Sequence, residues 1–269
     1  MKLIIVNITF LICTNFCLAQ TNTIFHISTV NNNSDVIKKN NILKEVIYNV
    51  TFVKDDKTDS SIFKTIDYNV MGDIIQETIF LGNNPSTTNY SYVYNQFGKI
   101  SKITKSTGKS IISINEFDYD SIGNEIVKYN YNQDTTFLTI EQKNFDINNN
   151  LIQLVTKINN SEAYISRKFF YDTDNKIIKI DALDPSGNFI FSNITEYNGF
   201  ESSMYLLNDR GKILESIITK SSNGFVTKIK MPKFNKTEEY SYYSDNTIYQ
   251  WVVLINNNVK QTYRHYYFK

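Results

Sequence analysis

The chain has 269 residues, of which 41% are hydrophobic and 14% aromatic, and its formal net charge is +1. So small a net charge excludes the strongly basic surface of a nucleic-acid-binding protein and the polybasic patch that draws proteins to anionic membranes. Its two cysteines, Cys13 and Cys17, lie close to the N-terminus, so the rest of the chain has neither disulfide nor thiol chemistry.

Residues 1–20 have the pattern of a secretory signal peptide. Lys2 precedes an apolar run from Leu3 to Leu18, and Ala19 supplies a small residue for cleavage. A membrane-spanning helix is the weaker interpretation, because polar residues interrupt the run. Cleavage would remove Lys2 and both cysteines, so that 27 Lys and Arg balance 27 Asp and Glu and the net charge becomes 0. We expect an exported protein in the periplasm, at the cell surface or outside the cell.

Three segments are expected in the chain. Residues 1–20 are the signal peptide, and residues 21–41 are rich in Asn and polar, which predicts a loose N-terminal arm. Residues 42–269 alternate polar residues with β-branched and aromatic ones and are predicted to form a single β domain.

A pattern returns at a nearly fixed interval through most of this domain. Each copy begins with an anchor residue, and the first six anchors are 25 or 26 residues apart, which is the signature of a repeat architecture. The anchors are Tyr68, Tyr94, Tyr119, Phe145, Tyr171, Tyr197 and, less regularly, Leu207 and Tyr242.

Seven of the copies share a turn signal. Asn or Asp usually follows the anchor, and only Gly or Asn stands four positions after it, as a backbone site with positive φ requires. These sites are predicted to be structural turn positions of hairpins. They are Gly72, Gly98, Gly123, Asn149, Asn175, Gly211 and Asn246.

A second turn lies midway through each copy, as in Asp184-Pro185-Ser186-Gly187. Each copy is therefore predicted to form two strands, and strands joined by such short turns are antiparallel neighbours. The predicted fold is all-β, a long antiparallel β-meander of ~26-residue two-strand repeats that forms a twisted or curled open sheet. A closed barrel is the alternative.

The copy that begins Tyr119-Asp120-Ser121-Ile122-Gly123, and the stretch from Tyr171 to Tyr197, resemble the YD repeat, also called the Rhs repeat. Its pattern is Tyr-Asp-x-x-Gly-Arg-Leu with a mid-unit Asp-Pro-x-Gly turn. About seven degenerate copies carry the resemblance, with Asn often in place of Gly and no toxin or self-cleaving segment. The resemblance implies a strip of β-sheet that spirals and, in long members, encloses a cargo.

Alternating aromatic residues are the first candidates for a binding site. Alternation places each set on one face of its strand, and the repeat would align the sets into a stripe that could stack on sugar rings. The structural interpretation, a cross-strand ladder that stabilises the sheet, is favoured because the repeat accounts for every member. The candidate ligand-stacking residues are Tyr90, Tyr92, Tyr94, Tyr129, Tyr131, Tyr249 and Trp251.

The sequence has no recognisable catalytic or metal-binding set. The only histidines, His26 and His265, are far apart in the chain, and no nucleophile motif accompanies them. The Asp-rich turns lack the Gly and Glu of a calcium loop, although weak calcium binding by a row of turns stays open. We therefore expect a protein that is not an enzyme and holds no cofactor.

Three functional hypotheses remain. The first is a non-catalytic exported scaffold or binding surface, with a carbohydrate or an envelope protein as partner and no role for nucleic acid. The second is an outer-membrane β-barrel, the only case in which we expect a membrane as partner. The third is an accessory or immunity partner of an Rhs-type toxin. Functional residues are expected where copies depart from the pattern, as at Glu125, in the unit from Tyr197 to Gly211, or near Trp251 and His265.

Overall fold

The computed structural model describes residues 34–52, 58–82, 84–132, 138–222 and 225–269. The signal peptide expected at 1–20, residues 21–33 and His26 lie outside this part of the chain. The described residues form a helix α1, Ser34–Lys39, a short 3-10 helix η1, Pro232–Phe234, and one 18-stranded sheet.

The first nine strands are β1 (Lys44–Phe52), β2 (Thr58–Tyr68), β3 (Ile74–Leu81), β4 (Asn84–Tyr94), β5 (Ile100–Thr107), β6 (Ser110–Tyr119), β7 (Glu125–Asn132), β8 (Leu138–Phe145) and β9 (Leu151–Ile158). The other nine are β10 (Tyr164–Tyr171), β11 (Ile177–Leu183), β12 (Phe189–Asn198), β13 (Glu201–Asn208), β14 (Ile213–Ser222), β15 (Phe225–Met231), β16 (Lys236–Tyr242), β17 (Ile248–Ile255) and β18 (Asn258–Phe268).

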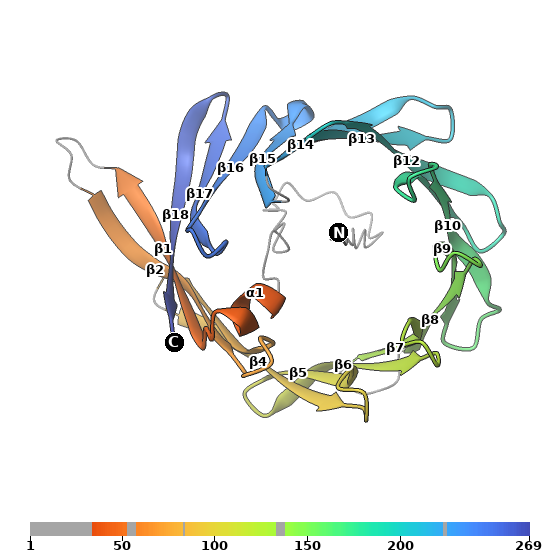
Figure 1. Cartoon of the computed structure of the whole chain (residues 1–269), viewed down its shortest axis with the longest axis horizontal. Helices are drawn as coiled ribbons and strands as arrows, with labels where there is room; N and C mark the ends of the chain where they lie inside the picture. The colour runs from red at the N-terminus through yellow and green to blue at the C-terminus, as the bar shows by residue number, and fades with distance from the viewer. Residues whose placement is uncertain (1–33, 53–57, 83, 133–137, 223–224) are drawn as a thin grey trace.

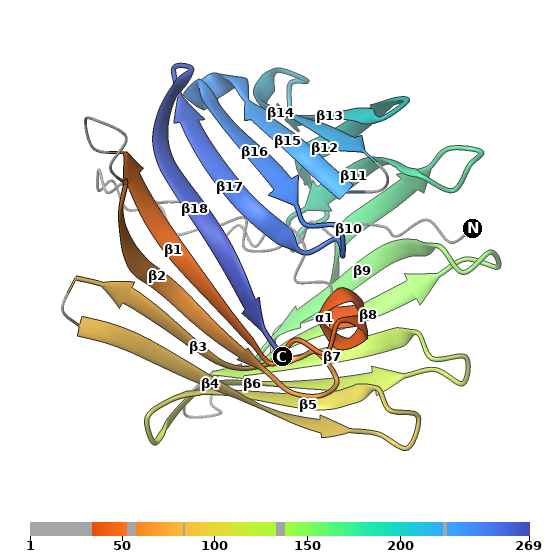
Figure 2. The same cartoon turned by 60° about the vertical axis from the view of Figure 1, so that its left-hand side comes forward.

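The sheet is closed. Every strand pairs antiparallel with its neighbours in the chain, and β1 also pairs with β18 in a register that runs from Lys44 opposite Phe268 to Val50 opposite Thr262. The strands therefore form a ring, which Figure 1 shows end on, and Figure 2 shows β18 lying beside β1. The all-β prediction is confirmed, but the open sheet was wrong and its alternative, the closed barrel, is correct. Closure comes from β1 and β18, which flank the repeats.

The turn after each anchor is built by a side chain. Asp120 Oδ1 accepts hydrogen bonds from the backbone amides of Ile122 and Asn124, at 3.0 and 2.8 Å. The backbone amide of Gly123 donates to the carbonyl of Asp120 at 3.1 Å. The same three contacts recur at Asn69, Asn95, Asp146, Asp172 and Asn208. An Asn or Asp after the anchor thus closes six of these turns, whereas the turn after Tyr242 has Tyr243 there and closes through backbone hydrogen bonds alone at that residue.

All seven predicted turn positions have positive φ. The values run from 58° at Asn175 to 92° at Gly123. This region of φ is open to Gly and tolerated by Asn, which explains why no other residue type occupies the position.

These turns define one rim of the barrel. The turns after β2, β4, β6, β8, β10, β12 and β16 lie at the same end of the ring, because successive strands run in opposite directions. We call this end the repeat-turn rim. The copy at Leu207 is displaced, since its turn follows β13 and therefore lies at the opposite rim. A short connection at Gly199 and Phe200 takes its place on the repeat-turn rim.

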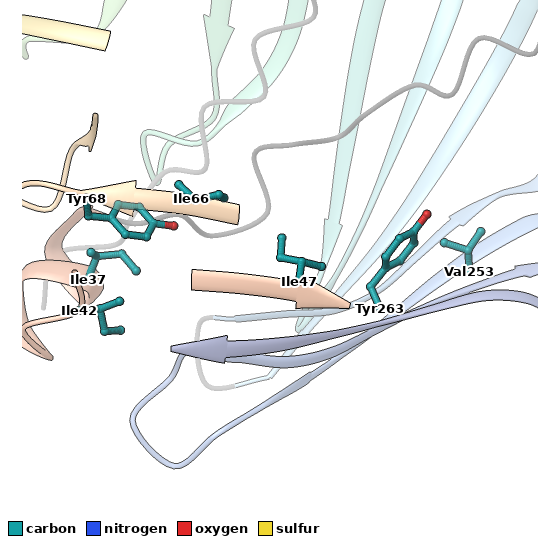
Figure 3. Packing of buried hydrophobic residues seen from close by; sticks show 7 residues of the cluster. All are labelled: Ile37, Ile42, Ile47, Ile66, Tyr68, Val253 and Tyr263. Carbon is teal, nitrogen blue, oxygen red and sulfur yellow. The ribbon is translucent and has the colours of Figure 1, made fainter. Parts of the chain in front are cut away.

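Helix α1 lies inside the ring (Figure 1). Its Ile37 packs with Ile42, Ile66 and Tyr68 in a buried cluster whose residues Figure 3 shows. The prediction of a loose arm at 21–41 is therefore wrong for its described end, because Ile37 is 2% exposed and fixes the helix to the barrel wall. Within the described ranges, no helix is long and apolar enough to cross a membrane.

The register assigns each side chain to one of two faces. Directly paired residues share a face, and the side of the wall that contacts Ile37 is the inner face. We followed this assignment from each strand to the next, allowing for the bulges. When it reaches β18, the face it assigns to each residue agrees with the face of its partner on β1. The anchor tyrosines lie on the inner face.

Two glycine substitutions test the turn geometry and the docking of α1. Gly72→Ala and Gly98→Ala both place a Cβ at positive φ, which costs about 1–2 kcal/mol. Only at Gly72 would the Cβ also overlap with a neighbouring element, the backbone of α1 at Ser34, whereas Gly98 has open space. Urea denaturation is expected to show a larger loss of unfolding free energy for Gly72→Ala. Equal losses would contradict the position of α1.

Candidate functional site

The inner face is buried on one arc of the barrel and partly exposed on the other. Two clusters of buried apolar residues lie on β14–β18, β1 and β2. On β4–β12 most inner side chains are only partly buried. The first arc therefore provides the core, and the second offers side chains that a ligand could contact.

A buried polar network lies where the two ends of the sheet meet. Glu45 of β1 is 1% exposed, and its Oε1 lies 2.5 Å from Nδ1 of His265 on β18. The Tyr68 hydroxyl donates to Glu45 Oε2 at 2.6 Å. Lys64 and Glu77 form an ion pair beside it on the same face. We call Glu45, His265, Tyr68 and Tyr267 the seam network.

The seam network holds Glu45 as a carboxylate. Burial alone raises the pKa of Glu45, but the hydrogen bond and positive charge of His265 and the hydroxyls of Tyr68 and Tyr267 outweigh it. The net result is a pKa below the ordinary value of a glutamate. Burial also lowers the pKa of Lys64, although the negative charge of Glu45 partly offsets this decrease. The network therefore keeps a carboxylate at Glu45 on β1 that pairs with His265 on β18.

Trp251 belongs to the core. Its ring stacks on Tyr240 at 6.2 Å between centroids and on Tyr263 at 4.6 Å. Tyr263 in turn contacts Phe63 at 4.9 Å. Because Trp251 has a ring neighbour on each side, it is not available to stack on a ligand.

Three other predicted aromatics lie together on the exposed arc. Tyr90, Tyr92 and Tyr94 share the inner face of β4, and the rings of Tyr92 and Tyr94 are 6.2 Å apart. Their hydroxyls bind the protein itself, at Glu77, the carbonyl of Ile74 and Asp73. The rings are therefore held in fixed positions, with those of Tyr92 and Tyr94 stacked on each other and Lys105 Nζ over one face of Tyr90.

The remaining predicted aromatics do not join this group. Tyr129 and Tyr131 lie on the outer face of β7, where Tyr129 contacts Asp118 at 3.2 Å. Tyr249 packs edge-on against Tyr243 at 5.0 Å. The predicted single stripe of aromatics is therefore wrong, because alternation fixes the face within one strand but not between strands separated by several bulges.

The sequence pattern missed the role of the anchor tyrosines. The hydroxyl of Tyr119 donates to the carbonyl of Ile100 at 2.7 Å, and the Nζ of Lys99 lies 5.4 Å from the centre of the same ring. Equivalent hydrogen bonds join Tyr171 to Leu151, Tyr197 to Ile177 and Tyr242 to Val226. These four anchors thus satisfy a carbonyl near the start of the preceding strand, whereas the hydroxyls of Tyr68 and Tyr94 bind the carboxylates of Glu45 and Asp73. The recurrence of Tyr rather than Phe was the available signal.

The outer face has charged residues in the middle of its strands. Lys228 and Glu239, each the fourth residue of its seven-residue strand, form an ion pair of 2.5 Å. Further outer pairs are Lys102 with Glu116 at 2.9 Å, Lys179 with Asp181 at 2.9 Å and Lys220 with Glu201 at 2.8 Å.

The acidic turns have a structural use. The hydrogen bond from the backbone amide of Asn150 lowers the pKa of Asp146, whose carboxylate closes its own turn.

Glu125, which departs from the repeat, pairs with Lys143 at 2.8 Å. Among the described residues no group of three or more His, Cys, Asp or Glu side chains is placed to hold a metal ion.

Comparison with known proteins gives likenesses of fold at low identity. No family model matches the sequence, and neither does any curated protein. A porin-like protein from Bacteroides uniformis is 9% identical over 84% of this chain and 96% of its own, with a TM-score of 0.43. A TcdB2-TccC3-Cdc42 structure is 8% identical over 79% of this chain, with a TM-score of 0.35. A Tc holotoxin pore from Photorhabdus luminescens is 9% identical over 76% of this chain, with a TM-score of 0.25. This chain spans 17% and 14% of those two chains, respectively.

Glu45→Gln tests the seam network. Removing one partner of a buried ion pair costs about 3–5 kcal/mol, so a large loss of unfolding free energy is expected at neutral pH. Because the folded pKa of Glu45 is lowered, its contribution is complete above the ordinary glutamate pKa and is lost as the pH falls through the folded value. Urea denaturation from pH 7 to pH 3 should therefore show a weaker acid dependence in Glu45→Gln. The exposed Glu196→Gln serves as control, and an equal effect of both changes would contradict the role of the seam.

Tyr119→Phe tests the anchor hydrogen bond. The change leaves the carbonyl of Ile100 without its donor and is expected to lower the unfolding free energy by about 1 kcal/mol. Tyr205→Phe, which removes a hydroxyl from the outer face, is the matched control and should leave stability nearly unchanged. Identical denaturation midpoints for Tyr119→Phe and the wild type would show that the hydrogen bond is dispensable.

Proposed function

We propose that this protein is an exported, water-soluble β-barrel that acts as a non-catalytic binding scaffold, with carbohydrate as the ligand class. The observation that carries the proposal is the combination of ion pairs in the middle of outer-face strands with partly exposed, fixed aromatic rings on the inner face. The seam and the turns use their polar groups for structure, which leaves this inner arc as the candidate binding surface.

The outer face supports a barrel that stands in water. A lipid-facing Lys or Arg costs about 2–4 kcal/mol near the middle of a bilayer, and transmembrane barrels present a continuous apolar band there. The pairs at Lys102, Lys179 and Lys228 would fall within such a band. Several strands also have only seven or eight residues, fewer than the 9–11 that span a bilayer. These features weigh against the outer-membrane alternative.

The inner arc supports a carbohydrate ligand. Tyr90 and Tyr92 present rings whose hydroxyls are already bound by the protein, so the rings can stack on a sugar without losing rotational freedom. The Nζ of Lys105 lies over one face of the Tyr90 ring, 5.7 Å from its centre, and Glu77 accepts the Tyr90 hydroxyl. A sugar would therefore stack on the other face of Tyr90, with these charged groups as hydrogen-bond partners at its edge. A protein partner is the competing occupant. The third hypothesis, a partner of an Rhs-type toxin, gains no support from the geometry of the described residues.

Two measurements test the proposal. The chain without residues 1–20 is expected to stay soluble and monodisperse without detergent, and to bind members of a glycan array. Tyr90→Ala should weaken that binding at least about tenfold, equivalent to about 1.4 kcal/mol, whereas Tyr131→Ala on the outer face should not. A need for detergent would favour the membrane barrel. Absence of glycan binding by the folded protein, or equal effects of the two variants, would overturn the carbohydrate assignment.

A further inference from the structure

The turns of the repeat-turn rim end in apolar side chains that contact little of the protein. At the tips of five of these turns stand Val70, Phe97, Ile122, Ile147 and Phe200, whose exposed fractions are 79%, 72%, 75%, 100% and 79%. In the part of the chain that the structure describes, these are the five most exposed large apolar residues. Four of them belong to consecutive copies, on the turns after β2, β4, β6 and β8.

The turn geometry does not require these residues to be apolar. The turns after β2, β4, β6 and β8 close through the Asn or Asp side chain and the Gly or Asn with positive φ, and these hydrogen bonds use no side chain from the two positions between them. Phe200 follows Gly199, which has positive φ, in a shorter connection. The turn after β10 has Thr173 and Asp174 at the same positions and keeps the same hydrogen bonds. Turn tips are ordinarily polar, so the recurrence of exposed Ile, Phe and Val on consecutive turns is not explained by turn geometry.

We propose that the repeat-turn rim docks the barrel onto the surface of a lipid bilayer, into which these apolar tips insert. Neighbouring strands lie about 4.8 Å apart, so tips on successive turns are separated by about 10 Å along the rim. The side chains thus form a row of separate projections rather than a continuous patch. A fluid lipid interface can surround each projection, whereas a folded partner would need a matching series of pockets.

The size of the surface favours lipid over a second copy of the chain. A stable protein–protein interface buries about 800 Å² on each partner in one contiguous, well-packed area. Five separated side chains fall well short of such a contiguous area. Apolar residues projecting from a surface are sufficient for interfacial membrane binding, whose strength follows the apolar area inserted.

The charges at this rim indicate which lipid headgroups the barrel would bind. Its four consecutive apolar turns include Asp73, Lys99, Asp120 and Asp146, a formal sum of −2 from one cation and three carboxylates. Lys99 is engaged by the carbonyl of Gly123. With no basic cluster in these four turns, attachment rests on apolar insertion, so it is expected on zwitterionic lipid and with little dependence on salt.

The N-terminal part of the chain reaches the barrel at the same rim. Ser34, where α1 begins, adjoins Gly72 in the turn after β2. The described part of the chain therefore begins beside the turn that bears Val70.

Vesicle flotation tests the proposal. The chain without residues 1–20 is mixed with phosphatidylcholine vesicles at low and high salt, without detergent, and is expected to float with them in both. A triple variant, Phe97→Ser, Ile122→Ser and Ile147→Ser, is expected to lower the partition coefficient at least about a hundredfold. The control triple variant changes apolar residues of the opposite rim, Leu81→Ser, Ile213→Ser and Val259→Ser, and should float like the wild type.

The opposite results are equally clear. Wild-type protein that stays in the soluble fraction, or a rim variant that floats as well as the wild type, would overturn the proposal. Light scattering that shows a wild-type dimer and a monomeric rim variant would assign the row to self-association instead. Ile147→Ser alone, at a side chain that is 100% exposed, provides the same comparison if the triple variant is unstable.

Discussion

The pairing of β1 with β18 is the constraint that turns a long meander into a barrel. It joins residues more than 200 positions apart, and the seam network fixes it from the inside. The carboxylate of Glu45 stays buried and charged through its partners His265, Tyr68 and Tyr267, because an unpaired buried charge is strongly unfavourable. The two ends of the sheet are therefore coupled, and the clusters of buried apolar residues on the adjoining strands depend on that coupling.

Between those ends the barrel repeats one local arrangement, a hairpin turn followed by a β-bulge, with variations. An Asn or Asp closes the turn, a Gly or Asn passes through positive φ, and a bulge displaces the register by one residue. The anchor hydroxyl of the next strand then binds a carbonyl beside that bulge. These contacts span no more than one repeat, so a copy such as the one at Phe145, which has no hydroxyl, is tolerated.

The sequence was most informative where structure is local. The strands, the antiparallel order and the seven turn positions follow from residues within one copy, such as Gly123 and its neighbours, because φ and side-chain capping depend only on the adjacent chain. Closure could not be read from the sequence, since the partner of Glu45 lies 220 residues away and His265 gives no sign of it. The faces of Tyr90 and Tyr129 were also unpredictable relative to each other, because each intervening bulge changes which alternate residue points inward.

The displaced copy at Leu207 shows that the turn does not depend on its place in the ring, since it keeps the same hydrogen bonds at the opposite rim. The seam has no such freedom. A closed sheet has no edge strand, and β1 and β18, which are rich in β-branched and aromatic residues, stand where the edges would be. If the seam opened, Val46–Val50 and Tyr263–Phe268 would present unpaired backbone beside β-branched and aromatic side chains. A folding intermediate with the ring still open would thus be able to add strands from other molecules, and late closure would set a limit on the concentration at which the protein refolds without fibrous assembly.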